Sequence, residues 1–170
     1  MATIAAENLL KAILELGENG ETVIAARLAE FLKISSAAVS MALKRLQRKG
    51  LVRVSGKRSI ELSPQGIRTT TVLVRRHRLV ERLLTDLLKM PWDKVHEEAE
   101  KLEHAISPEL EKRLLELFGE NGKCPHGNPF TPRLPHRRAP RTFPLTEAPE
   151  NRQLRVARIA ELHEKEKDFL

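Results

Sequence analysis

The N-terminal third of the chain has helically spaced apolar residues followed by a hairpin pattern, and together they restrict its fold. The spacing predicts helices over residues 3–17 and 22–33. A polar turn then leads into a third helix that ends near Lys49, and Ser35 or Ser36 is placed to cap its first turn. Two helices joined by such a turn are typical of a helix-turn-helix.

A β-hairpin is predicted directly after the third helix. Residues 51–54 and 59–62 are short β-like runs, and the turn between them carries Lys57 and Arg58. Helix, turn, helix and a basic hairpin together indicate a winged helix-turn-helix. The third helix is therefore the candidate recognition helix.

The start of this third helix is built from small side chains, which let a helix N-terminus approach a phosphate or a thymine methyl group. Basic residues follow on the same helix and at the hairpin tip, where they can reach phosphates. The predicted DNA-binding residues are Arg27, Ser35, Ser36, Ala37, Ser40, Met41, Lys44, Lys57 and Arg58. The alternative is that the basic residues only solvate an exposed surface.

The charge balance also favours a nucleic-acid partner. The net charge is +7 and the pI is near 9.9, which suits a polyanion. Aromatic residues make up only 4% of the chain and tyrosine is absent, so double-stranded DNA is favoured over single strands bound by base stacking. The single cysteine fits a reducing cytoplasm. No apolar run approaches the ~20 residues of a membrane span, so no membrane partner is expected.

Imidazole and carboxylate side chains recur at helical spacing in the middle of the chain. They fall on one stripe of each of two successive predicted helices: His77, Glu81, His96, Glu100, Glu103 and His104. These groups together suit Mn(II), Fe(II), Co(II) or Zn(II) better than Ca(II) or Mg(II), so the stripes predict a transition-metal site. The alternative is an ordinary solvated helix face.

The two helices that carry the stripes are predicted over 64–88 and 92–106, and another helix is predicted over 108–118. Ser-Pro pairs open the first and the last of these, as expected for an N-cap and a first helical residue. The long first helix has more leucines than one face needs, which favours a homodimer interface over a compact monomer. The predicted fold class is mainly α with a small β-hairpin wing.

Four regions are expected along the chain. A winged helix-turn-helix DNA-binding domain spans 1–63, and a helical metal-binding and dimerisation domain spans 64–120. Proline, glycine and arginine predict a basic linker over 121–150. Residues 151–170 are interpreted as the start of an incomplete SH3-like C-terminal domain, and alternation within 153–159 predicts one strand.

Three segments of the chain carry a family likeness. They are residues 76–84, which include His77 and Glu81, residues 94–104, and the Cys-Pro-His-Gly-Asn-Pro run at 124–129. With the winged helix, they make the chain resemble the diphtheria-toxin-repressor family of metal-dependent transcriptional regulators. That family includes iron- and manganese-responsive members.

The resemblance implies a regulatory metal site formed by Glu100, Glu103 and His104 with a ligand from the first helix, here Asn8. Glu100 is similar to the manganese-responsive members, whereas Asn8 departs from both types. Lys11 falls where one manganese-responsive type has a second carboxylate, which argues against that dinuclear site. We expect Glu103 and His104 to lie near the surface, and Glu100 and Glu103 to repel each other without a metal.

The resemblance also implies a second metal site, for which the sequence supplies two sets of ligands. His77, Glu81 and His96 match the ancillary site of iron-responsive members, which takes further ligands from a C-terminal SH3-like domain. Glu81, Cys124 and His126 match the second site of other, manganese-responsive members. The alternative for Cys124 and His126 is an ordered turn without a metal.

The function that the resemblance implies is repression of manganese or iron homeostasis genes. The cofactor is expected to be Mn(II) or Fe(II), with Zn(II), Co(II) or Ni(II) as surrogates. The partners are a palindromic DNA operator and a second copy of the chain, in the cytoplasm. Two alternatives remain at this stage, namely a winged-helix regulator of a non-metal ligand and a small metalloenzyme.

Overall fold

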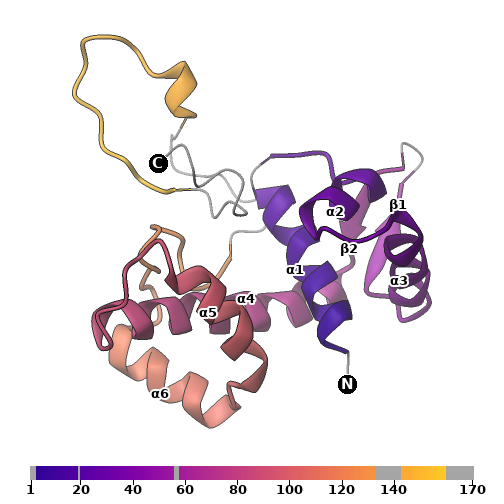
Figure 1. The fold of residues 1–170 in the computed structure, drawn as a ribbon, viewed down its shortest axis with the longest axis horizontal. Coiled ribbons are helices and arrows are strands. Elements are labelled where there is room, and N and C mark those ends of the chain that lie inside the picture. Colours follow the sequence, from indigo (N-terminus) through magenta and orange to yellow (C-terminus); the bar gives the residue numbers. More distant parts are fainter. Residues whose placement is uncertain (1–2, 19, 56–57, 133–142, 160–170) are drawn as a thin grey trace.

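The computed structural model describes residues 3–18, 20–55, 58–132 and 143–159 (Figure 1). Most of these residues are helical, and the strands form a single two-stranded sheet. In chain order the elements are α1 (Ile4–Glu18), α2 (Ala25–Phe31), α3 (Ser36–Arg48), β1 (Val52–Val54), β2 (Ile60–Leu62), α4 (Pro64–Asp86), α5 (Val95–Leu102), η1 (Glu103–Ala105), α6 (Pro108–Phe118) and η2 (Leu145–Glu147). The predicted fold class, mainly α with a β-hairpin wing, is confirmed.

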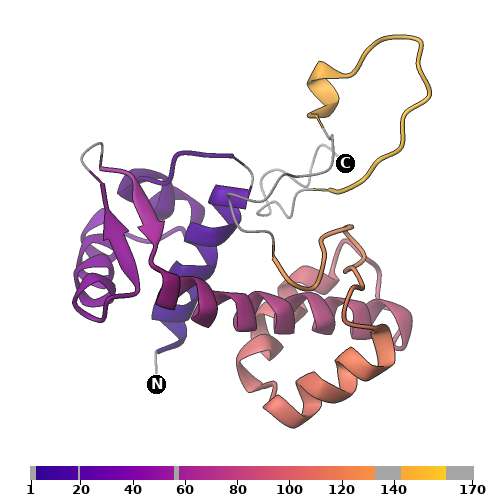
Figure 2. The ribbon, with the colours of Figure 1, turned by 180° about the vertical axis from the view of Figure 1, so that it is seen from behind.

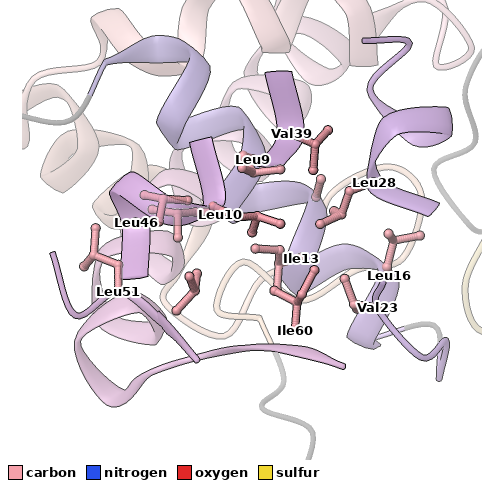
Figure 3. Close-up of a cluster of buried hydrophobic side chains, with 13 residues drawn as sticks. Leu9, Leu10, Ile13, Leu16, Val23, Leu28, Val39, Leu46, Leu51 and Ile60 are labelled. Atoms are coloured by element: carbon pink, nitrogen blue, oxygen red, sulfur yellow. The ribbon is translucent and has the colours of Figure 1, made fainter. Parts of the chain in front are cut away.

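The N-terminal unit is built around one apolar core (Figure 3). Leu9, Leu10 and Ile13 of α1 are buried there together with Val39 and Leu46 of α3. Burying a side chain of this size contributes roughly 1.5–3 kcal/mol relative to leaving it exposed. Because α1 and α3 share this core, any restraint on α1 is also a restraint on the candidate recognition helix.

Serine N-caps begin three of the helices, as the sequence predicts. Ser35 Oγ accepts the Ala38 N–H at the start of α3. The α4 and α6 helices begin with the same arrangement at Ser63 and Ser107, each followed by proline. A cap of this kind is worth about 1 kcal/mol.

The long helix α4 runs from beneath the N-terminal unit to the C-terminal helices (Figure 2). The start of α4 lies close to the chain that enters the hairpin. A Cβ on Gly66 would lie only 2.0 Å from the Leu51 carbonyl oxygen. Only glycine fits such an approach between a helix and a neighbouring backbone. The α1 helix packs on α4, and so do α5 and α6.

Two small apolar clusters hold α5, α6 and the following segment against α4. Val80 and Leu84 of α4 pack with Val95 of α5, and Leu79 of α4 packs with Leu114 and with Phe130. Phe130 follows α6 and is only 1% exposed. The first part of the predicted linker region is therefore packed against the helices.

Several predicted boundaries differ from the structure. The second helix begins at Ala25 rather than residue 22, because the Val23 carbonyl accepts the Ile60 N–H and holds the chain extended. The helix predicted over 92–106 begins at Val95, and its α-helical part ends at Leu102. A 3₁₀ turn follows at Glu103–Ala105, and Ile106 and Ser107 are extended before Pro108. An extended conformation at Ser107 is expected for the residue before a proline.

The strand predicted over 153–159 does not form. These residues are described without regular secondary structure and are mostly exposed. Ile159 N–H donates to the His126 carbonyl oxygen, but one bond does not make a ladder, and a strand needs a paired neighbour. Residues 133–142 of the predicted linker and 160–170 of the tail lie outside the described residues.

Candidate metal centre and DNA-binding surface

A buried cluster of metal-binding side chains is centred on one oxygen of Glu81. Glu81 Oε1 lies 3.1 Å from His77 Nε2, 3.3 Å from His96 Nδ1 and 3.3 Å from His126 Nδ1. Cys124 Sγ lies 3.9 Å from the same His126 nitrogen. His77 and Glu81 come from α4, His96 from α5, and the other two from the segment after α6. Both predicted ligand sets, one with the α5 histidine and one with the cysteine, therefore meet at Glu81.

The chemistry of this buried cluster fits a divalent transition metal. Carboxylate suits Mn(II), imidazole suits Fe(II) and Zn(II), and the thiolate is a softer donor that Zn(II) also accepts. Glu81 is fully buried, and its Oε2 atom has no hydrogen-bond partner among the described residues. A buried oxygen without a partner is costly, which argues for a ligand that fills its coordination.

His126 is oriented for such a role by a neighbouring carbonyl. Its Nε2 lies 3.1 Å from the Trp92 carbonyl oxygen, which can only accept a hydrogen bond. Nε2 therefore carries the proton, and Nδ1 presents its lone pair to Glu81 and Cys124. Metal-binding histidines are commonly held in this way by a hydrogen bond from the second nitrogen.

The electrostatics of the buried cluster favour a charged His77 in the metal-free protein. Burial and the Lys11 ammonium both disfavour the imidazolium, but Glu81 and Glu103 outweigh them and raise the pKa of His77 to about 10. Burial opposes ionisation of Glu81, yet the charge of His77 and the hydrogen bonds from His77 and His96 hold the pKa of Glu81 well below the ordinary value. His77 is then an imidazolium that donates to two carboxylates, with Nδ1 2.5 Å from Glu103 Oε2.

A second group, the junction cluster, consists of Asn8, Glu103 and His104 and connects α1 to η1. His104 Nδ1 lies 2.7 Å from Glu7 Oε2, so Nδ1 carries the proton. His104 Nε2 then faces Asn8 Oδ1 at 3.0 Å and Glu103 Oε1 at 3.5 Å. Three electron-pair donors are thereby gathered at one place, which is an arrangement that a cation stabilises.

Glu100 does not join the junction cluster, although the resemblance implies that it does. Its side chain is 46% exposed, and its Oε1 lies 3.6 Å from both His96 Nε2 and Lys11 Nζ. Among the described residues, Glu100, Glu103 and His104 are not gathered closely enough to share an ion. The α-helix ends between Glu100 and Glu103, so the single stripe predicted for them is broken.

Two expectations about the carboxylates are wrong. Glu103 is 1% exposed rather than near the surface, because the 3₁₀ turn points it inward. Glu100 and Glu103 were expected to repel each other without a metal, but the Lys11 ammonium lies between them, 2.9 Å from Glu103 Oε2 and 3.6 Å from Glu100 Oε1. His104 is close to the surface but partly covered by α1.

The predicted DNA-binding residues of α3 lie on its exposed side. Exposed side chains on this surface are those of Ser35, Ser36, Ala37, Ser40, Met41 and Lys44. Lys44 also lines a surface depression with Gln47 and Arg48. Arg58 is exposed in the hairpin, whereas Lys57 lies outside the described residues. Arg27 is held by Glu21 and Glu30 at 2.7 and 3.1 Å, so its charge is already paired within the N-terminal unit.

Comparison with known families decides where the chain belongs. Residues 1–60 match the iron-dependent repressor N-terminal DNA-binding domain, and residues 63–132 match the iron-dependent repressor metal-binding and dimerisation domain. The chain belongs to the diphtheria-toxin-repressor family of metal-dependent transcriptional regulators. In the described part of this repressor-family chain, no helix has the length and apolar character needed to cross a bilayer.

Curated relatives in the diphtheria-toxin-repressor family are similar over the same part of the chain. The iron-dependent repressor IdeR of Mycobacterium leprae is 41% identical over 124 residues, which are 73% of this chain and 54% of that protein. The diphtheria toxin repressor of Corynebacterium diphtheriae is 43% identical and the match covers 73% of this chain and 55% of that protein. The chain thus spans about half the length of these relatives.

Solved structures of the family agree with the fold. The manganese regulator SloR has a TM-score of 0.66 at 35% identity, and the match covers 74% of this chain and 58% of that chain. The T. acidophilum IdeR structure has a TM-score of 0.68 at 30% identity, covering 76% of this chain and 61% of that chain.

Sequence reasoning missed three residues that shape these sites: Glu7, Lys11 and Trp92. Lys11 was noted only as a residue that cannot be a ligand, although it touches both clusters. Glu7 is next to Asn8 in the sequence, but its role depends on a histidine 97 residues away. Trp92 contributes a backbone carbonyl, for which no side-chain pattern exists.

Proposed function

We propose that this chain is a metal-dependent transcriptional repressor of manganese or iron homeostasis genes. It binds a palindromic double-stranded operator as a cytoplasmic homodimer when Mn(II) or Fe(II) is bound, and Zn(II), Co(II) or Ni(II) serve as surrogates. Relatives and structural neighbours support the choice of metals, since they are described as iron-dependent repressors, a manganese regulator, and ScaR with bound Zn²⁺ or Cd²⁺.

The single observation that carries this proposal is the position of the junction cluster. Asn8 belongs to α1, which shares its core with the candidate recognition helix. Glu103 and His104 belong to η1, which packs on α4. The electron-pair donors therefore come from both sides of the boundary between the N-terminal unit and the rest of the chain.

This placement supports a mechanical account of regulation. A bound divalent ion would supply the positive charge that holds these donors at one point. Asn8 would then fix α1, and through the shared core α3, relative to α4. Glu7 keeps the His104 ring oriented, because it holds Nδ1 and leaves Nε2 for the site.

Exposed apolar side chains support the homodimer. Large apolar residues remain exposed on or near the helices that follow the N-terminal unit: Leu87, Leu88, Trp92, Leu102, Leu110 and Leu117. These side chains are candidates for the dimer interface, because residues 63–132 match a metal-binding and dimerisation domain. In a two-fold dimer, the recognition helices would enter major grooves ~34–36 Å apart on one face of the duplex.

The test uses DNA chosen by the protein itself. Random duplexes are selected on the Mn(II)-loaded chain, and the affinity of the selected duplex is measured with Mn(II) and with a chelator. We expect tighter binding with metal, and equal affinity would contradict the proposed switch. Arg58→Ala is the matched variant for the DNA surface. Arg58→Ala should weaken DNA binding both with Mn(II) and with the chelator. It should also reduce the slope of the logarithm of the DNA-binding constant against the logarithm of the salt concentration by about one.

A regulator that responds to a non-metal ligand is the second candidate. It would share the winged helix and the basic surface, but it would not need the His104 imidazole. Regulation that survives His104→Ala would therefore favour it. The family assignment and the DNA-binding surface argue against the metalloenzyme alternative.

A further inference from the structure

Lys11 is a buried cation between the two clusters. Its side chain is 4% exposed. The ammonium nitrogen lies 2.9 Å from Glu103 Oε2, 3.1 Å from His77 Nδ1 and 3.6 Å from Glu100 Oε1. One side chain of α1 therefore reaches α4, α5 and η1 together.

The neighbours of Lys11 keep it charged. Burial alone disfavours the ammonium, but Glu15, Glu103 and Glu100 outweigh burial and raise the pKa of Lys11 above its ordinary value. Burying a charge is costly unless it is paired and hydrogen-bonded. The contact with Glu103 meets that condition, so it connects α1 to η1 without any metal.

The same contact opposes a divalent ion. Glu103 Oε2 is engaged by Lys11 and His77, while Oε1 faces His104. A metal held through Glu103 would sit beside the ammonium, and a like charge within several ångströms disfavours a second positive charge. A metal held through Glu103 must therefore bind despite the repulsion from Lys11, or it must displace Lys11 from Glu103.

We propose that Lys11 is an internal cation that tethers α1 to the donor elements in the metal-free protein and competes with the divalent ion for Glu103. It thereby sets the metal concentration at which the junction cluster fills. This inference rests on the proposed function, because it assumes that the junction cluster binds a metal. Lys11 is a positioning residue in this account and not a metal ligand.

The test compares Lys11→Met with Lys101→Met in the full chain. Methionine keeps most of the stem of Lys11 and removes its charge. Lys101 carries the same charge on α5, but it is exposed and paired with Glu98 at the surface. Mn(II) affinity is measured by titration calorimetry, and melting is measured after chelator treatment.

We expect Lys11→Met to bind Mn(II) about tenfold or more tightly than the unmodified chain, since a nearby charge shifts an ionic equilibrium by roughly ten- to a thousandfold. The metal-free variant should melt several degrees lower, since it loses the tether and leaves Glu103 buried with fewer partners. Lys101→Met should change neither quantity. Unchanged or weaker Mn(II) binding by Lys11→Met would overturn the competition.

Two further outcomes separate this inference from the proposed function. If the unmodified chain binds neither Mn(II) nor Fe(II), the proposed function fails. The proposed competition between Lys11 and the metal for Glu103 then fails as well. The melting temperatures of the metal-free proteins still test whether Lys11 tethers α1. If Lys11→Met does not fold, Lys11→Gln replaces it, and tighter Mn(II) binding is then the criterion for the competition, because glutamine removes the charge of Lys11.

Discussion

The buried cluster and the junction cluster use similar side chains in different mechanical settings. The ligand atoms of the buried cluster come from α4, α5 and the segment after α6, which already pack together around Leu79 and Val80. The junction cluster takes Asn8 from α1 and Glu103 and His104 from η1. The buried cluster therefore lies within one packed group of elements, whereas the junction cluster connects the N-terminal unit to the elements that follow it.

Because of this difference, we expect the two clusters to affect DNA binding in different ways. In the proposed repressor, a metal in the buried cluster would stabilise elements that are already in place, so its effect on DNA binding would be indirect. A metal in the junction cluster would restrain α1, which shares a core with the candidate recognition helix α3. A ligand shifts a conformational equilibrium only through its differential affinity for the two arrangements. In the proposed switch, the metal-free and metal-bound arrangements would differ at the junction cluster.

The largest expected effect is the loss of stability when the centre of the buried cluster is removed. Glu81→Ala should lower the free energy of unfolding of the metal-free protein by roughly 3–5 kcal/mol, because the His77 imidazolium loses a buried partner. Glu100→Ala is the matched control, since this carboxylate is 46% exposed and should cost about 1 kcal/mol or less. Chemical denaturation measures both, and equal losses would contradict the assigned role of the buried cluster.

The next effect concerns the metal response itself. His104→Gln should remove most of the gain in DNA affinity that Mn(II) produces, a gain expected to be on the order of 5–150-fold. His126→Gln changes the buried cluster instead and should remove a smaller part. Binding of the selected duplex with and without chelator measures both gains. A larger loss in His126→Gln would reverse the assignment of the two clusters.

The pH dependence of the metal-free protein tests the charge of the buried cluster. The pKa of His77 is raised from 6.5 to about 10 by Glu81 and Glu103, against burial and Lys11. A raised pKa stabilises the fold fully below the unfolded value, and this stabilisation is lost as the pH rises toward the folded value. The melting temperature in chelator should therefore fall between about pH 6.5 and pH 10, and a flat profile would contradict a charged His77.

The smallest expected effect comes from the α1 ligand of the junction cluster. Asn8→Asp adds a negative charge next to His104 Nε2, where Asn8 Oδ1 now lies at 3.0 Å. We expect Mn(II) to bind several-fold to about tenfold more tightly, because an opposite charge nearby favours the bound cation. Titration calorimetry measures the change. An unchanged affinity would show that Asn8 lies outside the metal's coordination sphere.

The sequence predicts the local structure well where the signal is short-range. The Ser63–Pro64 and Ser107–Pro108 starts follow from capping chemistry, and the hairpin follows from its alternation. The stripe that joins His77 to Glu81 is also correct, because α4 continues without a break past both residues. These features depend only on residues close in the sequence.

The parts that the sequence does not predict depend on tertiary contacts. Glu103 turns inward where the α5 helix changes to a 3₁₀ turn, and this change breaks the regular spacing on which the stripe relied. The meeting of Cys124 and His126 with Glu81 requires the segment after α6 to fold back, and Phe130 holds it there. The position of Lys11 depends on how α1 packs on α4. None of these contacts has a periodic signature.

The most direct test of the coupling between the junction cluster and DNA is the Mn(II) affinity of the chain with and without its selected duplex. If closing the junction cluster also sets the recognition helix, DNA must tighten metal binding by the same factor by which metal tightens DNA binding. We predict a gain on the order of 5–150-fold in Mn(II) affinity when the duplex is present. An identical Mn(II) affinity in both conditions would contradict the coupling.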